Sequence, residues 1–329
     1  MIVLQVQGMQ AVEEEIRALA RKLLEEGTVE GVLGYARGPG ALTTSPILVK
    51  DPAQVERLAW DSTCDFNLAR YVPRGKDVPK LAVVAKGCVS RALVHLMVER
   101  QVQRENVYVI GVNCPGMLDK KRLDLEFGLA EIRQVTETDV DFTITGKDWE
   151  HTFRKEDYQR SMCVTCQHPV PPLFDALIGG DQAKPAVAAG YEDVAEFERK
   201  TPDERWEHFT KELRACTRCY ACRQACPLCY CTKCFCDQTQ PAWFGKSTSL
   251  SDVMIFHLVR GVHLFGRCVE CGDCNTVCPV NIDLTMVNRK LGQVARERFG
   301  FTAGIDLEAT PPFAAFKMDD PQEFMEEED

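Results

Sequence analysis

The sequence predicts an α/β N-terminal domain with a parallel βαβ unit, followed by a mainly helical domain organised around cysteines. Three patterns predict this fold: an amphipathic helical period near the N-terminus, a strand-helix-strand succession between residues 81 and 111, and two matching cysteine runs after residue 215. We expect an α/β domain at 1–170, a connector with helical pieces at 171–213, a helical domain at 214–300 and an acidic tail at 301–329.

The first elements alternate between helix and strand. From Met9 to Leu23, apolar residues recur at steps of three and four, and Gly27 follows where a helix can end. Short apolar runs at 31–35 and 47–49 are typical of strands, and the Gly and Pro residues between them are typical of a turn. The α/β character therefore begins at the N-terminus.

The central βαβ unit places two cysteines at one edge of the predicted sheet. An apolar run at 81–85 has the composition of a buried strand, and a helical stretch and a second apolar run at 107–111 follow it. A helix that joins two strands in this way makes them parallel. Cys88 and Cys114 follow the two strands, so we expect both at the carboxyl edge, where open α/β folds bind ligands. The alternative is that both are ordinary buried cysteines.

Charge and composition exclude several classes of function. The chain has 39 basic and 49 acidic residues and a net charge of −10, which opposes binding to nucleic acid or to an anionic membrane surface. Its start lacks the basic and apolar pattern of a signal peptide, and it has no uninterrupted apolar run of the roughly 18 residues that a spanning helix needs. We therefore expect a cytoplasmic protein without direct membrane insertion.

The 17 cysteines are ligand candidates rather than a disulfide framework, because a reducing compartment keeps thiols free. Two runs, at 216–227 and 268–279, share the spacing C-x2-C-x2-C-x3-C-P, in which three thiolates hold one [4Fe-4S] cluster and the fourth reaches the other cluster. Structural zinc sites use separated cysteine pairs, so zinc is the weaker alternative. We name the predicted ligands the first set, Cys216, Cys219, Cys222 and Cys278, and the second set, Cys226, Cys268, Cys271 and Cys274.

The segment between and after these runs is predicted to be helical, at 250–262 and again beyond Asp283. This domain resembles the helical two-cluster ferredoxins found in heterodisulfide reductase and succinate dehydrogenase subunits. Four more cysteines lie between the runs, in a density that packing alone does not require. They predict a further cluster or a zinc ion, against the alternatives of free thiols or of substitute ligands for the flanking run. These residues are Cys229, Cys231, Cys234 and Cys236.

The N-terminal half also contains enough cysteines for a third [4Fe-4S] cluster. A C-x2-C pair, Cys163 and Cys166, can close a site with the two cysteines at the sheet edge. We name Cys88, Cys114, Cys163 and Cys166 the N-terminal set. Cys64, near a predicted helix start, is the competing ligand.

Several segments resemble one known family. The stretches VVAKGCVSRALVHLM, VYVIGVNCPGM, MCVTCQHPVPPLFDALIGG and CRQACPLCYCTKCFCDQ are similar to the beta subunits of deazaflavin-coenzyme-reducing hydrogenases and formate dehydrogenases. The resemblance covers nearly the whole chain and is greatest to bacterial members with a C-terminal module for two [4Fe-4S] clusters. It implies that this protein is an electron-transfer subunit beside heterodisulfide-reductase-like, hydrogenase or formate dehydrogenase components.

The same resemblance implies FAD near the N-terminal cluster. A phosphate of that flavin would meet the start of the helix after Cys88, where free amides, Ser90 and Arg91 are available to an anion. The alternative for Arg91 is a solvated surface residue.

Three functions follow from these observations. The first is an iron-sulfur electron-transfer subunit of a cytoplasmic oxidoreductase complex, with other redox subunits as partners. The second is an FAD-dependent oxidoreductase that passes hydride to or from a deazaflavin or a nicotinamide. The third is an iron-sulfur redox sensor, which would need an effector domain that the sequence does not contain. The acidic end of the chain, 317–329, is either a solubilising segment or an anchor for a partner.

Overall fold

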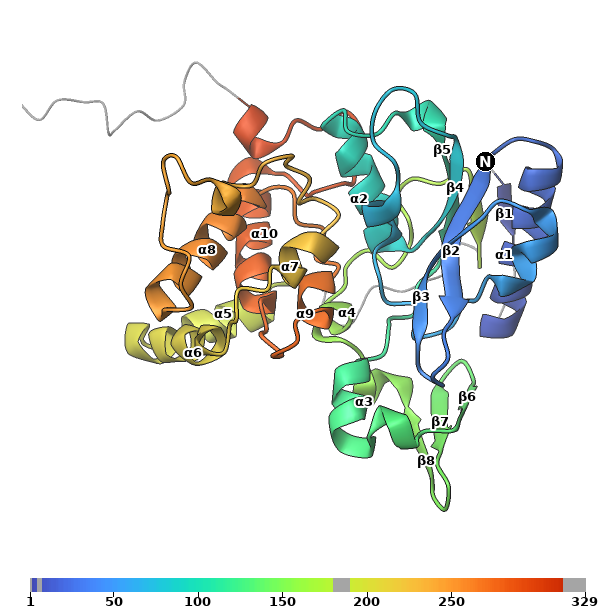
Figure 1. The fold of residues 1–329 in the computed structure, drawn as a ribbon, viewed down its shortest axis with the longest axis horizontal. Coiled ribbons are helices and arrows are strands. Elements are labelled where there is room, and N and C mark those ends of the chain that lie inside the picture. The colour runs from blue at the N-terminus through green and yellow to red at the C-terminus, as the bar shows by residue number, and fades with distance from the viewer. Residues whose placement is uncertain (1, 5–7, 180–189, 316–329) are drawn as a thin grey trace, which may run out of the picture.

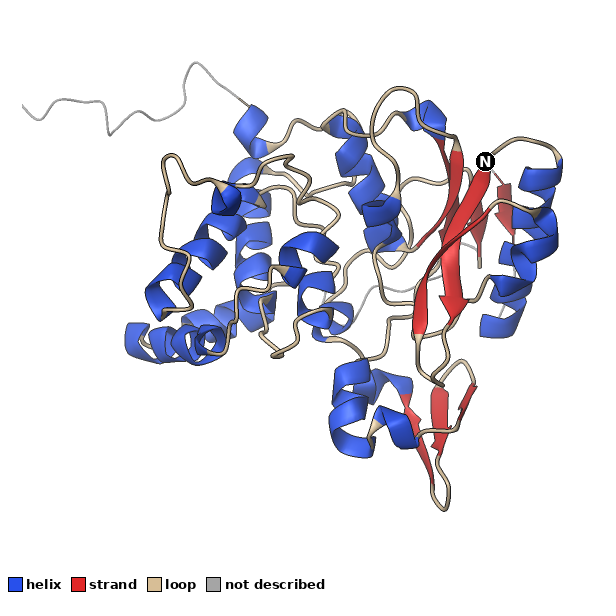
Figure 2. Cartoon of the chain, in the orientation of Figure 1, coloured by secondary structure: helices blue, strands red, loops and turns tan. Residues whose placement is uncertain are grey.

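The computed structural model describes residues 2–4, 8–179 and 190–315 (Figure 1). Its main sheet has six strands in the order β1-β9-β5-β4-β2-β3, all parallel except β3. A second sheet of three antiparallel strands, β6-β7-β8, lies apart from it (Figure 2). The strands are β1 Ile2–Leu4, β2 Gly31–Arg37, β3 Thr44–Val49, β4 Leu81–Ala85, β5 Val107–Val112, β6 Gln134–Glu137, β7 Asp141–Thr145, β8 Glu150–Arg154 and β9 Ala176–Ile178.

Helices cover both faces of the main sheet. Helix α1 packs on one face, and α2 lies on the other face between the sheet and the C-terminal helices (Figure 1). The helices of the α/β part are α1 Met9–Glu25, α2 Gly87–Val98, α3 Lys120–Phe127 and α4 Ser161–Val164. Those of the C-terminal part are α5 Glu192–Glu198, α6 Pro202–Arg214, α7 Ala221–Ala225, α8 Leu250–His263, α9 Asp273–Thr276 and α10 Thr285–Phe299.

The predicted βαβ unit is present as β4, α2 and β5, with β4 parallel to β5. All five side chains of β4 are buried, as expected for a strand covered by helices on both sides. Cys88 lies in the first turn of α2, and Cys114 follows β5, so both are at the carboxyl edge of the sheet. The α/β fold class is confirmed by this topology.

Two features of the α/β part differ from the sequence prediction. Strand β9, which lies between β1 and β5, extends the α/β domain to Ile178, beyond the expected boundary at 170. The sheet β6-β7-β8 was not predicted, because its strands are short and only β7 alternates buried with half-buried residues.

The C-terminal segment returns to the α/β part. Phe301 and Ala303 are buried in the same core as the main sheet, and Ala303 accepts a hydrogen bond from Arg91 of α2. The expected acidic tail therefore begins with a packed segment at 301–304. The segment 317–329, for which a solubilising role or an anchor was expected, lies outside the described residues. In the described part of the chain, none of the helices is both long and apolar enough to cross a lipid bilayer.

Replacing Gly304 by alanine is expected to destabilise this return segment. Gly304 has φ of +71°, and a Cβ there would overlap the backbone carbonyl of Arg91. Gly300 is a matched control, because it has φ of +60° and nothing within 4 Å of the added carbon. The left-handed backbone costs either alanine about 1–2 kcal/mol, and the overlap should cost Gly304→Ala about 1–3 kcal/mol more. Thermal unfolding of both variants under anaerobic conditions measures the difference, and equal melting temperatures would contradict this packing.

Candidate iron-sulfur sites

The N-terminal set lines a single cavity. All four of its cysteines border a space of about 690 Å³ at the carboxyl edge of the main sheet. Cys163 belongs to the short helix α4 and Cys166 follows it, in the segment that leads back into β9. Burial raises the pKa of the Cys114 thiol, and its neighbours Cys163 and Cys88 raise it further. The fold therefore brings together the four predicted residues from three separate segments.

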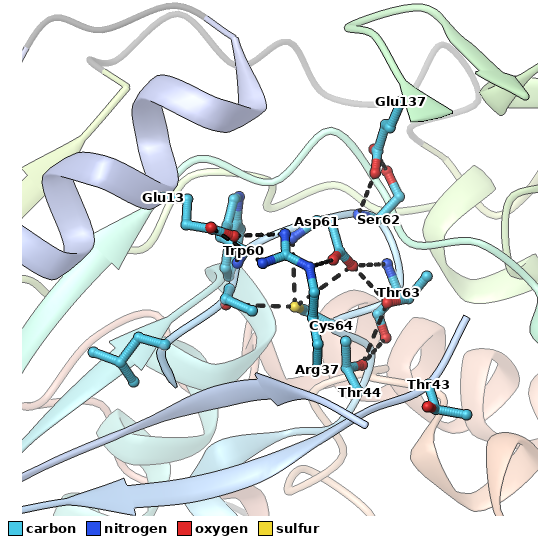
Figure 3. Close-up of polar contacts among 12 residues, drawn as sticks. Glu13, Arg37, Thr43, Thr44, Trp60, Asp61, Ser62, Thr63, Cys64 and Glu137 are labelled. Carbon is cyan, nitrogen blue, oxygen red and sulfur yellow. Dashed lines mark hydrogen bonds and ion pairs between the residues drawn. The ribbon is translucent and has the colours of Figure 1, made fainter. Parts of the chain in front are cut away.

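Cys64 lies apart from this cavity. Its sulfur donates to the carbonyl of Ala59 at 3.7 Å and accepts from the backbone amide of Asp61 at 3.5 Å (Figure 3). Asp61 in turn contacts Arg37, which is also paired with Glu13. Cys64 is completely buried in this polar network. These contacts favour the four cavity residues over Cys64 as ligands.

Each C-terminal run places its fourth cysteine beside the other run. Cys278, from the second run, lines a small cavity with the cysteines of the first run at 216–222. Cys226, from the first run, lies beside the second run, where its charge raises the pKa of Cys268 and of Cys271. Cys274 of the second set also borders the cavity of the first set, so the two sets adjoin.

The backbone of the two cysteine runs has the same unusual conformation. In the first run Arg218 and Tyr220 have φ of 54° and 61°. At the equivalent positions of the second run, Glu270 and Gly272 have φ of 55° and 74°. Left-handed backbone at a non-glycine residue costs energy, and it persists where the surroundings impose it, which is common at ligand sites. Both loops are therefore shaped to turn their cysteines inward.

Amide groups of the protein point at the ligand sulfurs. Backbone N–H groups donate to Cys163 from Met117 at 3.4 Å, and to Cys278 from Ile282 at 3.3 Å. The side-chain amide of Asn288 approaches Cys274 at 3.6 Å. Hydrogen bonds to the sulfurs are one of the means by which proteins tune iron-sulfur clusters. All 17 cysteines are free of disulfides, and thiolates are ligands for iron-sulfur clusters as well as for zinc.

Assembly of iron at these sites is expected to become more favourable as pH rises. Burial raises the pKa of Cys166 and of Cys222 to about 11, and that of Cys268 to about 12. At neutral pH these thiols are therefore protonated, and each must lose its proton to bind iron. We expect the apparent affinity for iron to rise at least about tenfold per pH unit between pH 7 and 8.5. Competition with a chelator measures this, and an affinity independent of pH would contradict it.

The N-terminal and second sets meet at the interface of the two domains. Cys271 of the second set borders the same cavity as the N-terminal set. Arg160 donates to the carbonyl of Cys271 at 3.1 Å and lies 3.8 Å from Asp273. Asp273 accepts from the backbone amide of Asn67 at 2.7 Å, and burial raises its pKa to about 6 although Arg160 acts in the opposite direction. The second set therefore adjoins both other sets, and we name the order N-terminal, second, first the line of sets.

Sequence reasoning missed these interface residues. Arg160 and Asp273 each lie within three positions of a predicted ligand. A charged residue so close to a predicted ligand could have indicated a contact with the site. Their pairing across more than 100 residues required the fold.

The four additional cysteines are not gathered at one point. Cys229, Cys231 and Cys234 border a cavity of about 300 Å³ that is rich in arginines. Cys236 is hydrogen-bonded to Cys234 and accepts from Arg223, a residue of that cavity, at 2.8 Å, whereas Cys231 is exposed. A hydrogen bond from Cys226 lowers the pKa of Cys229, which places Cys229 against the second set. The four cysteines therefore divide between a pair, Cys234 and Cys236, and a residue beside the second set, Cys229, and a further metal site stays a prediction.

The residues proposed for a flavin phosphate have partners inside the protein. The hydroxyl of Ser90 donates to the carbonyl of Leu173 and accepts from its amide. Arg91 donates to the carbonyls of Val269 and Ala303, and is buried rather than solvated. Both side chains therefore hold α2 against neighbouring segments. These contacts support neither a phosphate site at Ser90 and Arg91 nor a solvated Arg91.

Within 2–4, 8–179 and 190–315, no three His, Cys, Asp or Glu side chains converge as closely as one metal ion requires.

The chain is similar to two curated proteins over nearly its whole length. It is 25% identical to the F420-dependent formate dehydrogenase subunit beta of Methanocaldococcus jannaschii, covering 91% of this chain and 93% of that protein. It is 26% identical to the F420-dependent formate dehydrogenase 1 subunit beta of Methanococcus maripaludis, covering 90% and 92%. The resemblance to this beta-subunit family is confirmed.

The other comparisons add little. No protein-family model matches the chain. Among solved structures, a chain of the F420-reducing [NiFe] hydrogenase complex from Methanosarcina barkeri is 14% identical with a TM-score of 0.39, covering 53% of this chain and 70% of that one. That likeness is too low to support an argument about the site.

Proposed function

We propose that this protein is an iron-sulfur electron-transfer subunit of a multi-subunit oxidoreductase, with [4Fe-4S] clusters at the N-terminal, second and first sets. The observation that carries the proposal is the linear order of the three sets. One end of the line is the open cavity of the N-terminal set, and the other end is Cys219, the exposed member of the first set. Such a line conducts electrons between the cavity of the N-terminal set and the protein surface at Cys219.

The residues of the chain hold and tune this line. A [4Fe-4S] cluster takes up and releases one electron at a time. The thiolates fix the clusters, amide donors such as those of Met117 and Ile282 stabilise charge on sulfur, and the interface at Arg160 and Asp273 keeps the two domains together. Cys271 borders the N-terminal cavity, so a cluster at the second set would lie close to a cluster at the N-terminal set.

The partners are other redox subunits. The curated relatives are beta subunits of F420-dependent formate dehydrogenases, and we infer a cytoplasmic complex of formate dehydrogenase, hydrogenase or heterodisulfide-reductase-like type. Anaerobic purification of the natively expressed protein, followed by size-exclusion chromatography, tests this. The protein should elute well above 37.0 kDa with other redox subunits. A monomer that turns over a soluble hydride donor would contradict it.

A flavoenzyme is the second candidate. The cavity of the N-terminal set encloses about 690 Å³, whereas that of the first set encloses about 20 Å³. The larger volume is within the range of cofactor pockets, which supports FAD beside the cluster, and the names of the relatives favour F420 as its redox partner. One FAD per chain together with F420 reduction by the isolated protein would favour this function over the first.

A further inference from the structure

Arg260 is a buried cation between the first and second sets. It lies on the inner face of α8, and its side chain and backbone together are 5% exposed. Its guanidinium donates to the carbonyl of Cys222, a member of the first set, at 3.2 Å. Its Nε has no hydrogen-bond partner in the described part of the chain. The guanidinium is therefore only partly satisfied by the protein.

Its surroundings contain thiols of both sets. Burial acts to lower the pKa of Arg260, but Cys274 and Cys226 of the second set, together with Cys229 and Cys222, raise it overall. Among the described residues, Arg260 forms no ion pair with a carboxylate. A buried charge without a counter-charge is strongly destabilising. The negative charge that balances Arg260 must therefore come from the surrounding thiols, which belong to the two sets and to Cys229.

Arg160, at the other junction of the line, is a useful contrast. It is also buried, between Cys163 and Cys271, but Asp273 lies 3.8 Å from it and it donates to the carbonyl of Asp65 at 3.1 Å. Carboxylates of the protein thus offset its charge. At the junction of the first and second sets, no carboxylate of the described residues pairs with Arg260, so its charge acts on the neighbouring thiolates.

We propose that Arg260 is a positioning residue that raises the reduction potentials of the clusters in the first and second sets and eases the addition of an electron to each. The inference rests on the proposed function. Each added electron brings negative charge to two adjacent sites that repel one another, and a fixed cation between them offsets that repulsion. The cluster of the N-terminal set is separated from Arg260 by the second set and is unaffected.

A redox titration of the full chain, followed by EPR, tests the proposal. Arg260→Gln should keep its iron and shift the reduction equilibria of both C-terminal clusters at least tenfold toward the oxidised form, which is about 59 mV for a one-electron step. The potential of the N-terminal cluster should stay in place. Arg260→Lys, which keeps the charge, should retain most of the native potentials. Arg104→Gln, which removes a charge paired with Asp175 far from the sets, should change none of them.

The outcomes separate this inference from the proposed function. Wild-type protein without clusters would overturn the proposed function itself. Unchanged potentials in an iron-loaded Arg260→Gln variant would overturn the role of Arg260 and leave that function standing. If Arg260→Gln does not hold iron, the lysine variant decides: near-native potentials support a role of the charge, and a full tenfold shift despite the retained charge contradicts it.

Discussion

Cys271→Ser is expected to remove one cluster and to interrupt the line of redox sites at its middle. Cys271 is a member of the second set and also borders the cavity of the N-terminal set, so its loss affects both the ligand set and the junction between domains. Iron content should fall by roughly a third, since one of three cubanes is lost. The EPR spectrum of the reduced protein should lose the signal of the second cluster.

The matched control for this change is Cys231→Ser. Cys231 is exposed and belongs to none of the three sets. It should keep native iron and spectrum. The ligand assignment of the second set fails if Cys271→Ser retains all its iron and an unaltered spectrum.

Cys163→Ser should abolish the N-terminal cluster and leave the two C-terminal clusters in place. The sulfur of Cys163 faces the common cavity and accepts from the amide of Met117, and a serine oxygen is a poor ligand for iron. Cys64→Ser is the matched control, because Cys64 is buried in the network around Asp61 and lies outside the lining of that cavity. Iron analysis and EPR of both variants distinguish the ligands. Loss of the cluster in Cys64→Ser with its retention in Cys163→Ser would reverse the assignment.

Much of the α/β fold could be predicted because its strands are continuous apolar runs. The boundaries of β4 match the run at 81–85, and α1 covers the amphipathic period from Met9. Strand β9 was missed because it has only three residues and follows a proline-rich segment, so its place in the sheet depends on pairing with β1 and β5. Pairing between segments this distant in sequence leaves no local pattern.

The grouping of the cysteines was predictable because their spacing is typical of loops that hold [4Fe-4S] clusters. The exchange of Cys226 and Cys278 between the runs follows from that spacing alone. The charges around the sets were not predictable in this way. Arg260 looks from the sequence like any arginine of an amphipathic helix, and only the packing of α8 places it between two groups of thiols. The contacts of Ser90 and Arg91 were unpredictable for the same reason, since both side chains donate to backbone carbonyls of distant segments.

The most direct test of the account is the number of iron and sulfide ions in the full chain after anaerobic purification, with Mössbauer spectroscopy to identify the cluster type. Three ligand sets predict about twelve irons and twelve sulfides per chain, all in [4Fe-4S] clusters. A protein with about eight irons, whose N-terminal cysteines react freely with a thiol reagent, would contradict the line of three sites. So would zinc in place of iron in the first and second sets.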